Sequence, residues 1–131
     1  MHTRPCWVEI STRALEDNYR FLASLAGPHV ELLAIVKANA YGHALKLCAP
    51  AVINAGARWL GVTSVEEGIE ARRFCPDVRI LVIGGAFPGQ GRDIVRHKLI
   101  CSSEAGRYWP FSTQSVSVPS TSNHGQRYVN R

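Results

Sequence analysis

The sequence predicts an α/β fold built on a parallel sheet. Three short apolar runs, at residues 30–36, 59–62 and 78–83, alternate with segments whose apolar residues recur at helical spacing. Continuous apolar runs are typical of parallel strands, and strand–helix alternation indicates βαβ units. Right-handed crossovers leave two architectures open, a doubly wound sheet and a (β/α) barrel. A complete barrel needs eight units and about 250 residues, and this 131-residue chain supplies about three units.

The chain is predicted to open with a strand followed by an amphipathic helix. Residues 7–10 form a short stretch with the alternating faces of a strand. Ser11 or Thr12 can cap the next helix, and Gly27-Pro28 ends it. The apolar face of this helix consists of Leu15, Tyr19, Leu22 and Leu25.

Each of the three apolar runs is then followed by a predicted helix. The run at 30–36 is nearly all apolar, as expected of a strand covered on both faces. The helix after it, at about residues 44–55, contains Pro50, which should kink it or split it in two. After the second run, Ser64 and Glu67 match a capping box that opens a helix ending near Phe74. The third run precedes a Gly84-Gly85 turn and a helix over about residues 90–97.

The alternation of strands and helices stops near residue 100. The expected fourth strand and its helix do not appear, and residues 112–123 are polar and rich in serine. We therefore divide the chain into residues 1–99, an ordered unit, and residues 100–131, a divergent tail predicted to be disordered. A shifted reading frame explains this tail better than a selected flexible segment does, because the repeating pattern breaks off abruptly.

Composition and charge narrow the possible functions. The net charge of +5 comes without a basic run interleaved with aromatic residues, so no nucleic-acid partner is predicted. The longest apolar run, residues 32–36, is far shorter than the roughly 18 residues that span a bilayer. Because no secretory apolar segment is found near the N-terminus, we expect a cytoplasmic protein without a membrane partner. No C-x-x-C pair occurs and no metal site is predicted among the four cysteines, Cys6, Cys48, Cys75 and Cys101.

The stretch that indicates chemistry is residues 34–43, Ala-Ile-Val-Lys-Ala-Asn-Ala-Tyr-Gly-His. Lys37 stands at the carboxyl end of a predicted buried strand, the end at which parallel α/β sheets bind ligands. Desolvation there favours the neutral amine that Schiff-base chemistry requires. Tyr41 follows where the chain turns into the next helix, and its hydroxyl could donate to an anion held near that helix's N-terminus. The pattern alone also fits a structural alternative, a lysine whose head reaches solvent beside a half-buried tyrosine.

Residues 36–43 resemble the cofactor-attachment motif of alanine racemases nearly letter for letter, except that Ala44 stands where the family has glycine. Supporting similarity runs over about residues 7–99. The resemblance implies a partial (β/α) barrel of the fold-type III class, truncated relative to the family's eight strands, with pyridoxal 5′-phosphate (PLP) as cofactor. It also implies that Lys37 binds PLP covalently and serves as one of two proton-transfer bases. By the same resemblance, Tyr41 contacts the cofactor phosphate and Ile83 borders the cofactor.

The resemblance further implies an isomerase that interconverts L- and D-alanine, supplies D-alanine for peptidoglycan and works as a homodimer. PLP draws electron density from Cα and acidifies its proton, and racemisation needs two groups on opposite faces of that carbon. The family's second base is a tyrosine in a later β-rich domain, and its motif is absent from this sequence. The truncated fragment is therefore expected to be inactive alone. Another PLP-dependent amino-acid racemase and a non-catalytic PLP-binding remnant remain as alternatives.

Overall fold

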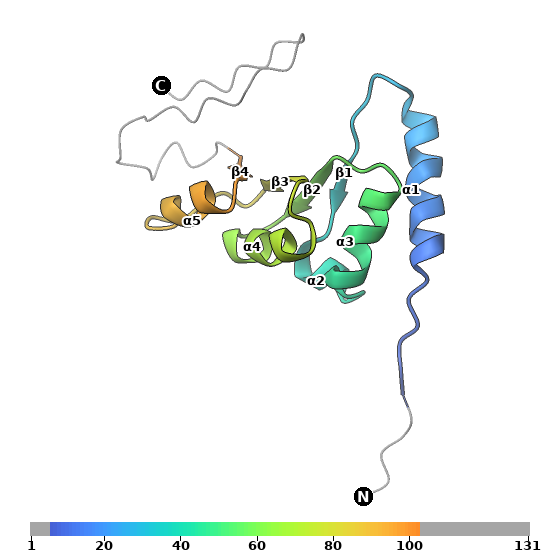
Figure 1. The fold of residues 1–131 in the computed structure, drawn as a ribbon, viewed down its shortest axis with the longest axis horizontal. Helices are drawn as coiled ribbons and strands as arrows, with labels where there is room; N and C mark the ends of the chain where they lie inside the picture. Colours follow the sequence, from blue (N-terminus) through green and yellow to red (C-terminus); the bar gives the residue numbers. More distant parts are fainter. Residues whose placement is uncertain (1–5, 103–131) are drawn as a thin grey trace, which may run out of the picture.

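The computed structural model describes residues 6–102 and shows a four-stranded parallel sheet (Figure 1). Strands adjacent in the chain are adjacent in the sheet, and every pair is parallel. A doubly wound sheet reverses its strand order at one point, whereas a barrel adds strands in sequence order. The predicted partial barrel is therefore confirmed. The strands are β1 (Leu33–Ile35), β2 (Trp59–Val62), β3 (Arg79–Val82) and β4 (Leu99–Cys101).

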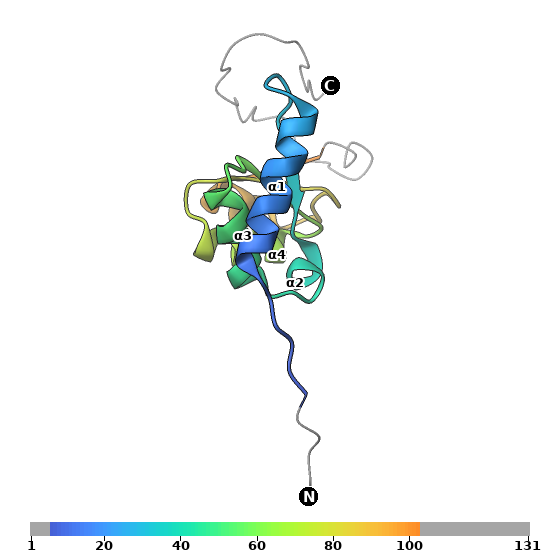
Figure 2. The same ribbon diagram turned by 90° about the vertical axis from the view of Figure 1, so that its right-hand side faces the viewer.

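The helices pack on one side of this sheet. Helix α4 contacts β2 and β3, α5 contacts β4, and α3 packs beside α4. The first helix packs on α3 and forms the outermost layer, as the rotated view shows (Figure 2). No helix within residues 6–102 is both long and apolar enough to cross a bilayer. The helices are α1 (Thr12–Ala26), α2 (Lys37–Tyr41), α3 (Leu45–Asn54), α4 (Val65–Phe74) and α5 (Gly91–Arg96).

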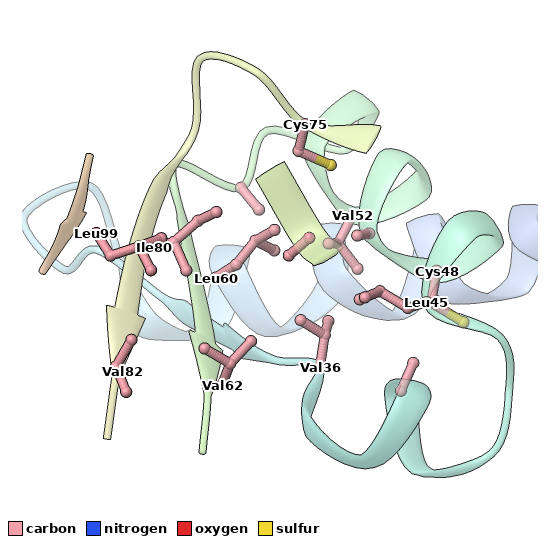
Figure 3. Close-up of a cluster of buried hydrophobic side chains, with 14 of the residues drawn as sticks. Val36, Leu45, Cys48, Val52, Leu60, Val62, Cys75, Ile80, Val82 and Leu99 are labelled. Atoms are coloured by element: carbon pink, nitrogen blue, oxygen red, sulfur yellow. The ribbon is translucent and has the colours of Figure 1, made fainter. Parts of the chain in front are cut away.

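The hydrophobic core lies between the sheet and helices α3 and α4 (Figure 3). Every second residue of β2 and β3 points toward the helices, because side chains alternate along a strand. These strand residues are Leu60, Val62, Ile80 and Val82, and each is fully buried. The helices meet them with Leu45, Val52, Val65 and Ala71, which are also buried.

The opposite face of the sheet is apolar but only partly buried within the described part of the chain. A Cβ placed on Gly61 would lie 2.5 Å from Ile35 Cδ1 and 3.1 Å from Ile83 Cδ1, so these side chains gather over the glycine. The prediction that residues 30–36 are covered on both faces is therefore wrong. Right-handed crossovers place the helices on one side, and a barrel turns the other side inward.

The predicted strand at residues 7–10 is also wrong. The segment pairs with no strand in the described residues and extends away from the body in Figure 1. Trp7 and Val8 are 72% and 78% exposed, and the Trp7 indole donates locally to Glu9 Oε1 at 2.9 Å. An alternating pattern makes a strand only where a hydrogen-bonding neighbour is present.

Two further expectations need correction. The predicted split at Pro50 does not occur: helix α3 runs unbroken through it, and the carbonyl that this proline leaves without an amide partner belongs to the exposed residue Lys46. A fourth strand does exist: β4 pairs with β3 through Val82 and Cys101. It is only three residues long, too short to give a periodic signal in the sequence. Most of the predicted tail, residues 103–131, lies outside the described residues.

Candidate functional site

Lys37 lies at the carboxyl end of the sheet, as predicted. Strand β1 ends at Ile35, and the buried residue Val36 extends the ladder by donating its amide to the Gly61 carbonyl at 2.8 Å. Lys37 follows directly and is half-buried. Its backbone is thus fixed by the sheet on one side, while its side chain lies at the edge where parallel sheets bind ligands.

The residues after Lys37 form a left-handed turn instead of a loop. Ala38 to Tyr41 all have φ between 50° and 55°. Such a conformation costs an L-residue roughly 1–2 kcal/mol, so the surrounding structure must hold it in place. Asn39 Oδ1 accepts from the Leu45 amide at 2.7 Å, and the Ala40 side chain is buried in the core. These contacts anchor the turn to the start of α3.

The turn brings Tyr41 back toward the lysine. Lys37 Nζ lies 6.0 Å from the centroid of the Tyr41 ring. Tyr41 is 59% exposed and ends the left-handed turn, well before α3 begins at Leu45. The expectation that Tyr41 stands at the start of the next right-handed helix is therefore wrong. The local sequence does not predict this turn, because Ala-Asn-Ala-Tyr contains no glycine and a single asparagine does not indicate four consecutive residues with positive φ.

The Lys37 side chain carries an amine at this edge of the sheet. Within the described residues, no carboxylate lies within ion-pair distance of its Nζ. Once it has lost its proton to water, a half-buried amine beside a solvent-facing phenol can attack a carbonyl compound entering from solvent.

Ile83 lies at the same edge of the sheet, two strands away from Lys37. It follows β3 directly, and its amide donates to the Val62 carbonyl at 2.8 Å. Its side chain is 44% exposed and lies with Ile35 over Gly61. The structure thus places Ile83 on the inward apolar face and not in the core between sheet and helices.

The main surface hollow of the described residues lies away from Lys37. One surface hollow of about 510 Å³ lies between the C-terminal ends of α3 and α4, near Ala57 and Arg79 at the amino end of the sheet. Lys37, Tyr41 and Ile83 do not line it. In the stretch from residue 6 to residue 102, no group of His, Cys, Asp and Glu side chains could hold a metal ion.

Sequence reasoning missed one residue at this site. Glu67, assigned only to a helix cap, accepts a hydrogen bond from the amide of Ala38 at 2.7 Å. The two residues are 29 positions apart, so no local pattern reports the contact.

A parallel sheet whose strands follow in sequence order, with a half-buried lysine after its first strand, defines the class of the protein as a (β/α) barrel. Residues 10–104 match the family model described as "Alanine racemase, N-terminal domain". The chain belongs to the alanine racemase N-terminal domain family.

Relatives of known sequence and structure agree with this assignment. The alanine racemase of Symbiobacterium thermophilum is 44% identical over 96 residues, which cover 73% of this chain and 25% of that protein. The alanine racemase of Nostoc is 42% identical over 94 residues, 71% of this chain and 24% of that protein. The chain thus spans about a quarter of the length of the relatives it matches.

Solved structures share the fold as well. The alanine racemase of Bartonella henselae, with covalently bound pyridoxal phosphate, has a TM-score of 0.66 and 34% identity, covering 70% of this chain and 27% of that one. The Bacillus anthracis alanine racemase with bound L-Ala-P has a TM-score of 0.72 and 28% identity, covering 86% of this chain and 31% of that one.

Proposed function

We propose that this chain is the N-terminal part of a PLP-dependent alanine racemase barrel and that it holds PLP through Lys37. The observation that carries the proposal is the half-buried Lys37 amine at the carboxyl end of β1, 6.0 Å from the Tyr41 ring and without a carboxylate partner in the described residues. The covalently bound pyridoxal phosphate of the Bartonella henselae relative supports it.

The described residues fit this cofactor chemically. The Lys37 amine can condense with the cofactor aldehyde, and the exposed Tyr41 hydroxyl can donate to its phosphate. Ile83 and Ile35 offer an apolar surface on the inward face of the sheet, where a flat ring would be shielded from water. When bound, PLP draws electron density from the Cα of an amino acid and acidifies its proton.

Lys37 would take or return that proton on one face of the substrate. We assign no second proton-transfer group within residues 6–102, and inversion at Cα requires two. We therefore propose that the interconversion of L- and D-alanine, in the cytoplasm and for peptidoglycan, belongs to a longer homodimeric protein without nucleic-acid or membrane partners. The chain alone then acts as a PLP-binding unit over about residues 1–99, with residues 100–131 as a divergent tail.

Trapping the cofactor on the protein tests this proposal. The full chain is mixed with PLP, reduced with borohydride and digested, and the labelled peptide is identified by mass spectrometry. Label should lie on Lys37 and fall at least about tenfold in Lys37→Arg. Lys46→Arg, an exposed position on α3, serves as the matched control and should keep the label. Equal labelling of Lys37 and Lys46 would refute cofactor binding at this site.

An assay for D-alanine separates binding from turnover. The chain alone, loaded with PLP and given L-alanine, should form no D-alanine. Racemisation above the rate of free PLP would show that residues of this chain supply both proton-transfer groups.

A further inference from the structure

The Glu67 carboxylate joins two segments that lie far apart in the chain. Its Oε1 accepts from the amide of Ala38 at 2.7 Å, and its Oε2 accepts from the amide of Thr63 at 2.7 Å. Ala38 is the residue after Lys37, and Thr63 is the residue after β2. Both oxygens of one side chain thus fix the backbone at the carboxyl ends of two neighbouring strands.

This arrangement departs from an ordinary helix cap. Ser64 Oγ accepts from the Glu67 amide at 3.3 Å, as the capping box predicts. In a reciprocal capping box, the glutamate side chain would accept a hydrogen bond from the backbone amide of the N-cap residue. Here the Glu67 carboxylate accepts hydrogen bonds from the amides of Thr63 and Ala38 instead. Since Ser64 already caps α4, the contact with Ala38 has no role in starting that helix.

The contact lies where the backbone is most strained. Ala38 is the first of four consecutive non-glycine residues with positive φ, and the direction of the Lys37 side chain depends on how the chain enters this turn. Hydrogen bonds to an ionised carboxylate are stronger than those between neutral groups. A charged acceptor at the first amide of the turn therefore stabilises the left-handed conformation directly.

We propose that Glu67 is a positioning residue that holds the Lys37 amine in its reactive place by fixing the amide of Ala38. The inference rests on the proposed function of Lys37. It concerns a residue that acts through the backbone, with no contact to the reacting atoms.

The test compares Glu67→Gln with Glu66→Gln. A glutamine is uncharged and carries an NH₂ donor in place of one acceptor oxygen, so the arrangement of one oxygen for each amide is broken and the remaining acceptor is weaker. Glu66 is the neighbouring residue on the same helix, and its Oε1 accepts from Gln90 Nε2 at 2.7 Å, away from the turn. Ser64→Ala adds a control that weakens the start of α4 but leaves the carboxylate in place.

The first measurement needs no cofactor. Hydrogen exchange of the Ala38 amide, followed residue by residue in the full chain by NMR, should be faster by about tenfold or more in Glu67→Gln than in Glu66→Gln. Equal exchange rates in the two variants would overturn the proposal. If Glu67→Gln does not fold, Glu67→Asp takes its place, because it keeps the charge but shortens the reach by one carbon.

The second measurement is the PLP concentration that gives half-maximal borohydride labelling of Lys37. It should rise about tenfold or more in Glu67→Gln, and it should stay near the unaltered value in Ser64→Ala even if that variant loses as much folding stability. An equal rise in Ser64→Ala would reduce Glu67 to a structural role and overturn the proposal. Absence of labelling in the unaltered chain would refute the proposed function instead, and the exchange comparison would still decide whether Glu67 holds the turn.

Discussion

Replacing Ala44 with glycine should stabilise the fold by about 1 kcal/mol. Ala44 precedes α3 with φ 70° and ψ 102°, a conformation that L-residues seldom adopt. Holding a non-glycine residue there costs roughly 1–3 kcal/mol. Glycine also destabilises the fold by about 0.4–1 kcal/mol, because it raises the conformational entropy of the unfolded chain. Loss of the half-buried methyl costs less than the roughly 0.8 kcal/mol of a fully buried CH₂ group, so middle values leave a net gain.

Urea unfolding followed by circular dichroism measures this gain. The control is Ala14→Gly, at an exposed position inside α1 where φ is helical and glycine should cost about 0.5–1 kcal/mol. Both substitutions remove one methyl group, and the methyl of Ala44 is the more buried of the two, so burial alone would make Ala44→Gly the more costly change. A gain in stability at Ala44 therefore comes from the backbone conformation. If Ala44→Gly loses stability as Ala14→Gly does, the argument from backbone strain is refuted.

Two other predictions concern charged side chains away from Lys37. Arg72 donates to five backbone carbonyls that join α4, β3 and β4, those of Cys75, Pro76, Val78, His97 and Lys98. Arg72→Met should therefore cost at least about 2 kcal/mol in urea unfolding, whereas Arg73→Met, at the exposed neighbour, should cost about 0.5 kcal/mol or less. Equal losses would contradict this role. Hydrogen bonds from Trp59 and then from Arg79 hold the pKa of Glu31 below its ordinary value of 4.5. Because the folded-state pKa is depressed, the stabilisation is complete above 4.5 and is lost as the pH falls through the lowered pKa. Glu31→Gln should therefore be less stable than the unaltered chain at neutral pH, and a difference that persists well below pH 4.5 would contradict the assignment.

The elements that the sequence predicted well are those whose signals are local. Ser64 caps α4 through the Glu67 amide, and the helix ends at Phe74 as expected. Strands β2 and β3 fall inside the predicted apolar runs, because their alternate residues are buried by the helices. A cap or an apolar run is visible within a few residues, so no knowledge of the remaining fold is needed.

The features that the sequence did not predict depend on partners elsewhere in the chain. Residues 7–10 have the alternation of a strand, but the described structure offers them no strand to pair with. Strand β4 is a three-residue segment whose identity comes from its pairing with β3. The amide of Ala38, which has positive φ, is held by Glu67 from another helix, and within Ala38 to Tyr41 only Asn39 is of a type that readily adopts this conformation.

The strain of the turn after Lys37 is itself evidence that the direction of this side chain matters. Four residues in the left-handed region cost roughly 4–8 kcal/mol at 1–2 kcal/mol each, as much as the whole stability of many small domains. The described fold compensates this strain with a hydrogen bond from the Ala38 amide to Glu67 Oε1, a hydrogen bond from the Leu45 amide to Asn39 Oδ1 and the burial of Ala40. Three independent contacts on one short turn are more than a connection between a strand and a helix requires. Such contacts are expected if the lysine amine must be held at a fixed position relative to the carbonyl carbon that it attacks.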